Sequence, residues 1–161
     1  MKLKDIEYIV VHCSATREGQ PYDVEDIRDM HVRGRGWSDV GYHFIIKLDG
    51  TVQKGRDLDV MGAHVKGYNS KSIGICYIGG LDSEGKPKDT RTPAQKEAML
   101  KLLQVLKVAL PKAEILGHRD LSPDLDGDGE VEQREWTKSC PSFDVRLWLR
   151  NPDWFPPFVV N

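Results

Sequence analysis

Hydrophobic and polar positions alternate along the chain in a way that predicts short strands joined by helices and turns. Three apolar segments rich in β-branched residues predict buried strands: residues 8–12, 72–78 and 114–117. The first ends at His12, and the third presents His118. Residues 42–48 and 51–53 flank Asp49-Gly50, a strong short-range signal for a β-hairpin.

Apolar residues recur at helical spacing in two further regions. Residues 24–31 predict a helix of about three turns, which Gly34 and Gly36 bring to an end. Residues 92–95 read Thr-Pro-Ala-Gln, a capping box with proline at the first helical position, and Pro111 ends the helix that follows.

The remaining segments complete a single-domain prediction. Residues 81–91 are polar and rich in turn formers, which indicates a surface loop, and residues 144–149 predict a short helix. The tail, residues 151–161, contains three prolines beside aromatic residues, and we expect it to pack over the domain. We predict an α+β fold with α/β-type layers: one domain, residues 1–161, with a central mixed β-sheet flanked by helices.

Composition and charge narrow the classes of function. The 161 residues carry a net charge of −2 without a long basic run, which disfavours a nucleic-acid partner. The apolar run at residues 8–11 is too short for a signal peptide, and no segment is long enough to span a bilayer. We therefore expect a monomer that is synthesised in the cytoplasm and binds no membrane.

Three cysteines cannot form a disulfide framework, so free thiols or a metal ligand are expected. His12, His118 and Cys140 are candidate ligands for one zinc ion, because two imidazoles and a thiolate suit zinc and leave a fourth position open. The wide spacing of the three is a weak signal by itself, since a single histidine at a strand end is more often an ordinary polar residue. For Cys13 and Cys76 we expect buried, inert thiols.

Several motifs in one order give a more specific indication. The chain resembles the type 2 family of zinc-dependent N-acetylmuramoyl-L-alanine amidases, which includes short phage enzymes and is related to the peptidoglycan recognition proteins. The resemblance extends from about residue 6 to residue 149. It is carried by residues 10–16, 41–46, 49–52, 55–56, 64–69, 72–74, 92–95 and 138–144.

Carried over by position, the resemblance implies zinc ligands at His12, His118 and Cys140 and catalytic roles for Tyr42 and Lys138. Zinc would activate a water for attack on the carbonyl that joins N-acetylmuramic acid to L-alanine. Lys138 would stabilise the oxyanion, and Tyr42 would hold the water or pass a proton to the leaving amine. Taken alone, Tyr42 could equally be a strand aromatic and Lys138 a solvated charge.

Other histidines have less specific interpretations. The resemblance implies that His64 and Asn69 line the substrate groove and bind the peptide stem, although both could equally serve a turn. We expect structural roles for His31, on a helix, and for His43, which points away from Tyr42 if its strand is regular.

An acidic insert at residues 124–135 departs from the family pattern. It matches the EF-hand loop signature, which predicts a structural Ca²⁺ site. The oxygen ligands would be Asp124, Asp126, Asp128, the backbone carbonyl of Glu130, and Glu135. Pro123 argues against an incoming helix, so the site would be half an EF-hand, and a solvated acidic loop is the alternative.

The leading hypothesis is a phage or prophage endolysin that hydrolyses peptidoglycan after release from the cytoplasm, with peptidoglycan or muropeptides as its partners. The alternative is a recognition module that binds peptidoglycan without catalysis. Binders of that kind typically lack the cysteine ligand, so Cys140 together with Tyr42 favours the enzyme. A calcium sensor is less favoured, because a single loop without paired helices rarely acts as one.

Overall fold

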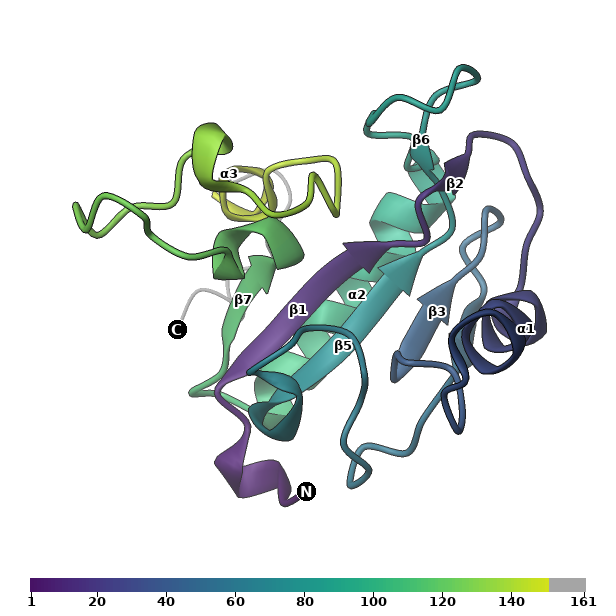
Figure 1. Cartoon of the computed structure of the whole chain (residues 1–161). Coiled ribbons are helices and arrows are strands. Elements are labelled where there is room, and N and C mark those ends of the chain that lie inside the picture. The colour runs from purple at the N-terminus through teal and green to yellow at the C-terminus, as the bar shows by residue number, and fades with distance from the viewer. Residues whose placement is uncertain (151–161) are drawn as a thin grey trace.

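A five-stranded mixed sheet forms the centre of the computed structural model, which describes residues 1–150 (Figure 1). In spatial order its strands are β4 (Val52–Lys54), β3 (Phe44–Ile46), β5 (Ser72–Tyr77), β1 (Tyr8–Cys13) and β7 (Glu114–Gly117). β1 lies parallel to both β5 and β7, β3 is parallel to β5, and β4 pairs antiparallel with β3. The predicted mixed sheet flanked by helices is therefore confirmed.

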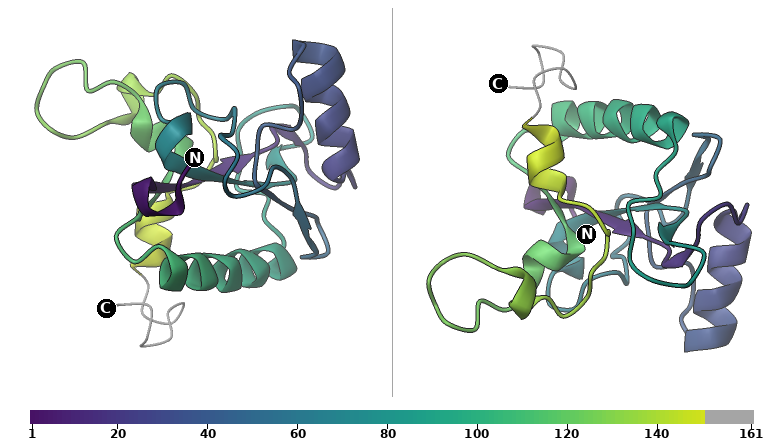
Figure 2. Two further views of the ribbon diagram at one scale, coloured as in Figure 1. Left: turned by 90° about the horizontal axis from the view of Figure 1, so that it is seen from below. Right: turned by 90° about the horizontal axis from the view of Figure 1, so that it is seen from above.

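Helices cover both faces of the sheet (Figure 2). α2 (Pro93–Ala109) lies along one face, α1 (Val24–Arg35) lies against the other, and α3 (Val145–Leu149) contacts β7. Within residues 1–150, none of the helices is both long and apolar enough to cross a membrane.

The two faces of the sheet follow the alternation of side chains along the strands. Ile9 and Val11 of β1 pack with Met99 and Leu103 of α2 in the main core. Residues of even number point to the opposite face, so His12 stands on the side away from α2. The alternation thereby places the first candidate ligand near the carboxyl end of β1, which is buried from Ile9 onward.

Both long helices begin at a capped residue: the cap of α2 was predicted, and the cap of α1 was not. Asp23 caps α1 by accepting the backbone N–H groups of Glu25 and Asp26. Thr92 and Gln95 form the expected capping box of α2. Each cap satisfies N–H groups that have no partner within the helix, which defines where the helix begins.

The hairpin differs from its prediction in two respects. β3 begins at Phe44, so Tyr42 and His43 precede the strand. The loop has three residues, because Lys47 and Thr51 are still joined by a backbone hydrogen bond of 2.9 Å, and Gly50 takes a left-handed φ of 84°. This is a turn followed by a glycine bulge, a common alternative to the two-residue hairpin.

Six further short elements were not predicted. β2 (Thr16–Arg17) pairs with β6 (Gly80–Leu81) in a small second sheet, so the expected loop at residues 81–91 begins with a strand residue. The 3₁₀ turn η3 (His118–Leu121) begins at His118. The other short 3₁₀ turns are η1 (Leu3–Asp5), η2 (Asn69–Lys71) and η4 (Gln133–Glu135). The prediction for residues 151–161 lies outside the described residues.

Candidate metal centre and cleft

His12 and His118 meet because the strands that carry them are neighbours in the sheet. β1 and β7 run parallel with Val11 opposite Gly117, so both histidines follow at the carboxyl ends of adjacent strands. Their ring centroids are 4.7 Å apart. This end of an open α/β sheet is where ligands commonly bind.

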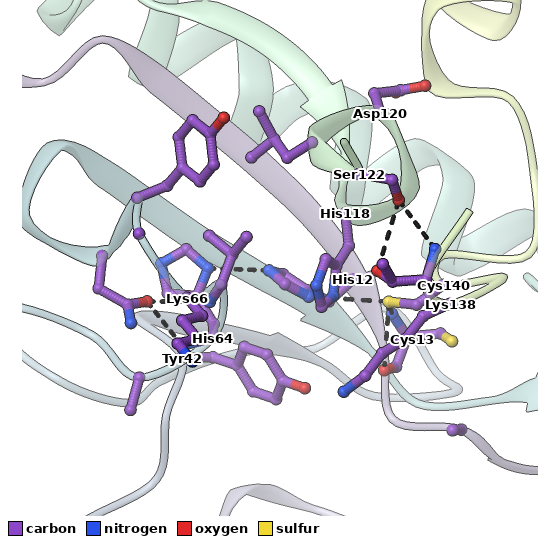
Figure 3. Close-up of a pocket in the computed structure, with 18 of the residues that line it drawn as sticks. His12, Cys13, Tyr42, His64, Lys66, His118, Asp120, Ser122, Lys138 and Cys140 are labelled. Atoms are coloured by element: carbon purple, nitrogen blue, oxygen red, sulfur yellow. Dashed lines mark hydrogen bonds between the residues drawn. The ribbon is translucent and has the colours of Figure 1, made fainter. Parts of the chain in front are cut away.

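Cys140 joins the two histidines from the segment that follows the insert. The backbone N–H of Arg119 donates to the carbonyl of Cys140 at 2.9 Å, which ties this segment to η3. From the core side, the Tyr77 hydroxyl donates to the carbonyl of Pro141 at 2.6 Å. Cys140 Sγ consequently lies 3.7 Å from Nδ1 of His12 (Figure 3).

The three side chains fit a tetrahedral zinc ion. Ligand atoms of His12, His118 and Cys140 all lie within 4.8 Å of one another. Zinc bonds of 2.0–2.3 Å in a tetrahedron place neighbouring ligand atoms roughly 3.5 Å apart. The observed sulfur–nitrogen separation agrees with that value, and three protein ligands leave one position for water or substrate.

Burial favours the neutral form of both imidazoles, which is the form that binds a metal ion. It lowers the pKa of His12 well below its ordinary value, and it lowers the pKa of His118 to about 4. Both rings are therefore neutral near pH 7 and keep a lone pair. Contact with the Cys13 thiol and burial raise the pKa of Cys140, and a divalent cation would reverse that shift by deprotonating the thiol.

Tyr42 packs beside the metal-binding group. Its ring centroid is 5.1 Å from that of His12, and its carbonyl accepts the backbone N–H of Arg56 at 2.9 Å. Burial raises the pKa of Tyr42 well above its usual range, so the hydroxyl stays protonated at neutral pH. The phenol is thus available as a hydrogen-bond donor at the edge of the site.

Lys138 is exposed and lines the same cleft (Figure 3). Its positive charge contributes to the lowered pKa of both His12 and His118, after the larger effect of burial. The backbone N–H of the preceding Thr137 donates to Ser122 Oγ at 3.1 Å, which fixes the approach of this segment. The charge of Lys138 therefore acts on both imidazoles from within the cleft.

His64 and Asn69 both line the cleft, and both also make hydrogen bonds within the protein. Asn69 Oδ1 accepts the backbone N–H groups of His64 and Val65 at 2.8 and 2.9 Å, which closes a turn. The His64 ring bonds to His12 and Ser72. Ser72 belongs to a motif that carries the family resemblance, but the sequence predicted no role for it in the site.

The two other histidines have the structural contacts expected of them. His31 Nδ1 accepts the backbone N–H of Gly41 at 2.9 Å, and its ring also forms part of the cleft wall. His43 is buried, with its ring bonded to the backbone of Val60 and Gly74. Cys76 is fully buried, while Cys13 is buried in the core and donates its backbone N–H to Cys140 Sγ at 3.3 Å.

The cleft around the metal-binding group has a volume of about 1200 Å³. Arg35 at the end of α1 and Trp37 just beyond the helix line one part of it. Lys66 and Tyr68 line another part. The acidic insert contributes Asp124 and Val131 to the wall. The insert therefore borders the space in which a substrate would lie.

Within the insert, carboxylates organise the loop backbone. Asp124 accepts the N–H groups of Gly127 and Gly129 at 2.7 and 2.8 Å. Glu135 accepts N–H groups from both ends of the loop, including that of Leu125 at 2.8 Å. The three aspartates at the first, third and fifth loop positions are exposed and bring oxygen atoms within 4.8 Å of one another.

Comparisons with known proteins identify the family. The sequence profile of the N-acetylmuramoyl-L-alanine amidases matches residues 2–142. The chain belongs to this family. It is 46% identical to the endolysin of Klebsiella phage KP32 over 147 residues, which are 91% of this chain and 87% of the relative.

Solved structures agree with this assignment. The amidase LysC of Clostridium intestinale URNW matches 91% of this chain and 83% of its own, with a TM-score of 0.68 and 26% identity. A Drosophila PGRP-LB mutant in complex with tracheal cytotoxin matches 94% of this chain and 83% of its own, with a TM-score of 0.67 and 25% identity. The amidase cleaves the bond between N-acetylmuramic acid and L-alanine in peptidoglycan, so the non-catalytic alternative is not supported.

Proposed function

We propose that the amidase reaction is zinc-dependent and that His12, His118 and Cys140 hold the metal. The observation that carries this proposal is the approach of Cys140 Sγ to within 3.7 Å of His12 Nδ1 beside a second neutral imidazole. Two imidazoles and a thiolate form a donor set that zinc prefers over harder divalent cations. When bound there, zinc supplies a Lewis acid that polarises the scissile carbonyl and lowers the pKa of water.

Tyr42 and Lys138 would assist from the protein side. The Tyr42 hydroxyl remains protonated, so it can orient the attacking water or give a proton to the leaving amine of L-alanine. Lys138 would place a positive charge beside the oxyanion that forms when the carbonyl is attacked. For Asn69 and His64, contact with the peptide stem stays a prediction.

Peptidoglycan or soluble muropeptides would occupy the cleft, an extended pocket with basic, aromatic and acidic walls. A structural relative solved with tracheal cytotoxin supports a ligand of that kind. We propose that residues 1–161 form one amidase domain with an insert at residues 124–135. The chain would act on the cell wall as a monomer after release from the cytoplasm, without binding nucleic acid or membrane.

The acidic insert would bind calcium through Asp124, Asp126, Asp128, Glu130 and Glu135. The exposed carboxylates of the three aspartates lie close together, and a hard divalent cation would relieve their mutual repulsion. Calcium would order the wall of the cleft formed by Asp124 and Val131. This role is structural and separate from the chemistry at the zinc ligands.

The test is mass spectrometry of a muramoyl-peptide digest made with the zinc-loaded protein, the chelated protein and the chelated protein after zinc is restored. We expect release of a free peptide that begins with L-alanine, loss of that product on chelation, and recovery with zinc. Cleavage that persists after complete removal of the metal would overturn zinc dependence. Intact substrate in every reaction would overturn the activity itself.

A further inference from the structure

Three hydrogen bonds connect a backbone carbonyl to the first zinc ligand. Ser72 Oγ donates to the carbonyl of Tyr68 at 2.8 Å and lies 3.2 Å from His64 Nε2. On the other side of the same ring, His64 Nδ1 lies 2.8 Å from His12 Nε2. This series of hydrogen bonds thus runs from the Tyr68 carbonyl through Ser72 and His64 to His12.

Ser72 determines which atom is the donor and which is the acceptor in each of these hydrogen bonds. A hydroxyl has one proton, and that of Ser72 is directed to the carbonyl of Tyr68. The oxygen of Ser72 must therefore accept the proton on His64 Nε2. A neutral imidazole carries only one N–H, so Nδ1 of His64 presents a lone pair to His12.

Both rings are neutral on the evidence of their surroundings. His12 is 1% exposed and His64 is 8% exposed. Within residues 1–150, neither has a carboxylate among its hydrogen-bond partners, and burial without a counter-charge disfavours the protonated ring. With a lone pair on His64 Nδ1, the short contact requires the proton on His12 Nε2.

We propose that Ser72 and His64 are positioning residues that hold His12 in the tautomer with its proton on Nε2. Nδ1 of His12 is then left with a lone pair, and this is the atom that faces Cys140 Sγ at 3.7 Å. The second nitrogen of a metal-binding histidine commonly fixes the ring in this way. The inference rests on the proposed zinc site and assigns to His64 a role toward His12 that is separate from its predicted contact with the peptide stem.

The ring of His64 is held firmly enough for this role. Asn69 Oδ1 accepts two backbone N–H groups, that of His64 and that of Val65, so the backbone that carries the ring is fixed. The ring lies flat against β5 at Gly74, where an added Cβ would stand 2.8 Å from His64 Cγ. Any larger residue at that position would displace the ring from His12.

The first test uses the unaltered protein without metal. Two-dimensional ¹⁵N–¹H spectra that correlate ring nitrogens with ring carbon-bound protons identify the tautomer of each histidine. We expect His12 and His64 both to carry the proton on Nε2. A His12 that is protonated on Nδ1 would overturn the proposal, and this result does not depend on zinc binding or on activity.

The second test compares His64→Asn with His64→Leu by competition against a chromophoric zinc chelator. The two replacements have nearly the same shape, but only asparagine offers an acceptor for His12 Nε2–H. We expect His64→Leu to bind zinc 10- to 100-fold more weakly than the parent, the usual effect of losing a residue that hydrogen-bonds to a metal ligand, and His64→Asn to recover most of this loss. Ser72→Ala should fall between them.

Circular dichroism checks that both variants are folded. Equal zinc affinity of folded His64→Asn and His64→Leu would contradict the proposed role of His64 toward His12. A parent protein that binds no zinc would instead contradict the proposed function. In that case the tautomer measurement still decides whether Ser72 and His64 fix the tautomer of His12.

Discussion

At the scale of single residues, the proposed catalytic role of Tyr42 can be tested separately from metal binding. Its ring lies 5.1 Å from that of His12, and Tyr42 is not one of the three proposed zinc ligands, His12, His118 and Cys140. We expect Tyr42→Phe to lower kcat by about 10²- to 10⁴-fold, because a positioned proton donor is lost, while zinc content stays unchanged. Steady-state hydrolysis of a defined muropeptide, together with metal analysis, checks both expectations.

Tyr22→Phe is the matched control for this substitution, since Tyr22 packs near α1 and does not line the cleft. It should retain the parent kcat. A fully active Tyr42→Phe would show that the phenol takes no part in the reaction.

The residue scale also shows where prediction from sequence ends. His12, His118 and Cys140 were identified by residue type and resemblance, and the structure brings all three together. The hydrogen bond from His12 to His64 was not predicted, because it joins residues 52 positions apart through the order of the strands. Motifs identify ligands, whereas the partners of those ligands depend on the packing around them.

At the scale of elements, the acidic insert is a compact loop that borders the cleft. If it binds calcium, the melting temperature of the parent should rise when calcium is added, since a ligand that binds only the folded state stabilises it. Asp124→Ala should abolish that rise, because it removes the first ligand of the loop. Scanning calorimetry with calcium and with a chelator measures the effect.

Glu97→Ala removes an exposed carboxylate on α2 instead and should preserve the response to calcium. A parent protein whose melting temperature is the same with and without calcium would rule out the site.

The N-terminal cap of α2 makes a contribution to the free energy of unfolding that can be measured. Thr92 Oγ1 accepts the N–H of Gln95 and donates to the carbonyl of Leu48 at 2.7 Å, so it joins the helix to the hairpin. We expect Thr92→Ala to lower the free energy of unfolding by about 1–2 kcal/mol, the usual cost of losing an N-cap. Urea unfolding measures it.

Thr92→Ser keeps the hydroxyl and should stay close to the parent. Zinc affinity should not change in either variant, because the cap lies outside the cleft. An alanine variant as stable as the parent would mean that the cap contributes little here.

At the scale of the whole molecule, burial lowers the pKa of all five histidines. The pKa falls to about 3 for His64 and to about 4 for His31 and His118. Between these values and about 6.5, the unfolded chain binds more protons than the folded one, so stability is retained above pH 6.5 and falls as the pH decreases. Each histidine contributes up to about 1.4 kcal/mol per pH unit.

Urea unfolding of the metal-free protein at pH 7.5, 6.5 and 5.5 measures this loss. Most carboxylates titrate below this window, so the decrease between pH 6.5 and 5.5 reports mainly on the histidines. The same free energy of unfolding at pH 6.5 and 5.5 would contradict the neutral, buried state of these rings.

The sequence by itself determined the types of the main elements, the capping box of α2, the family and the identity of the candidate zinc ligands. These depend on periodicity, on contacts within a few positions, or on motifs that can be recognised in order. Only the tertiary structure decided that β1 and β7 are neighbours, that the insert borders the cleft, and that His64 is bonded to His12. Such contacts join residues far apart in the chain, and their geometry depends on the packing of the whole sheet.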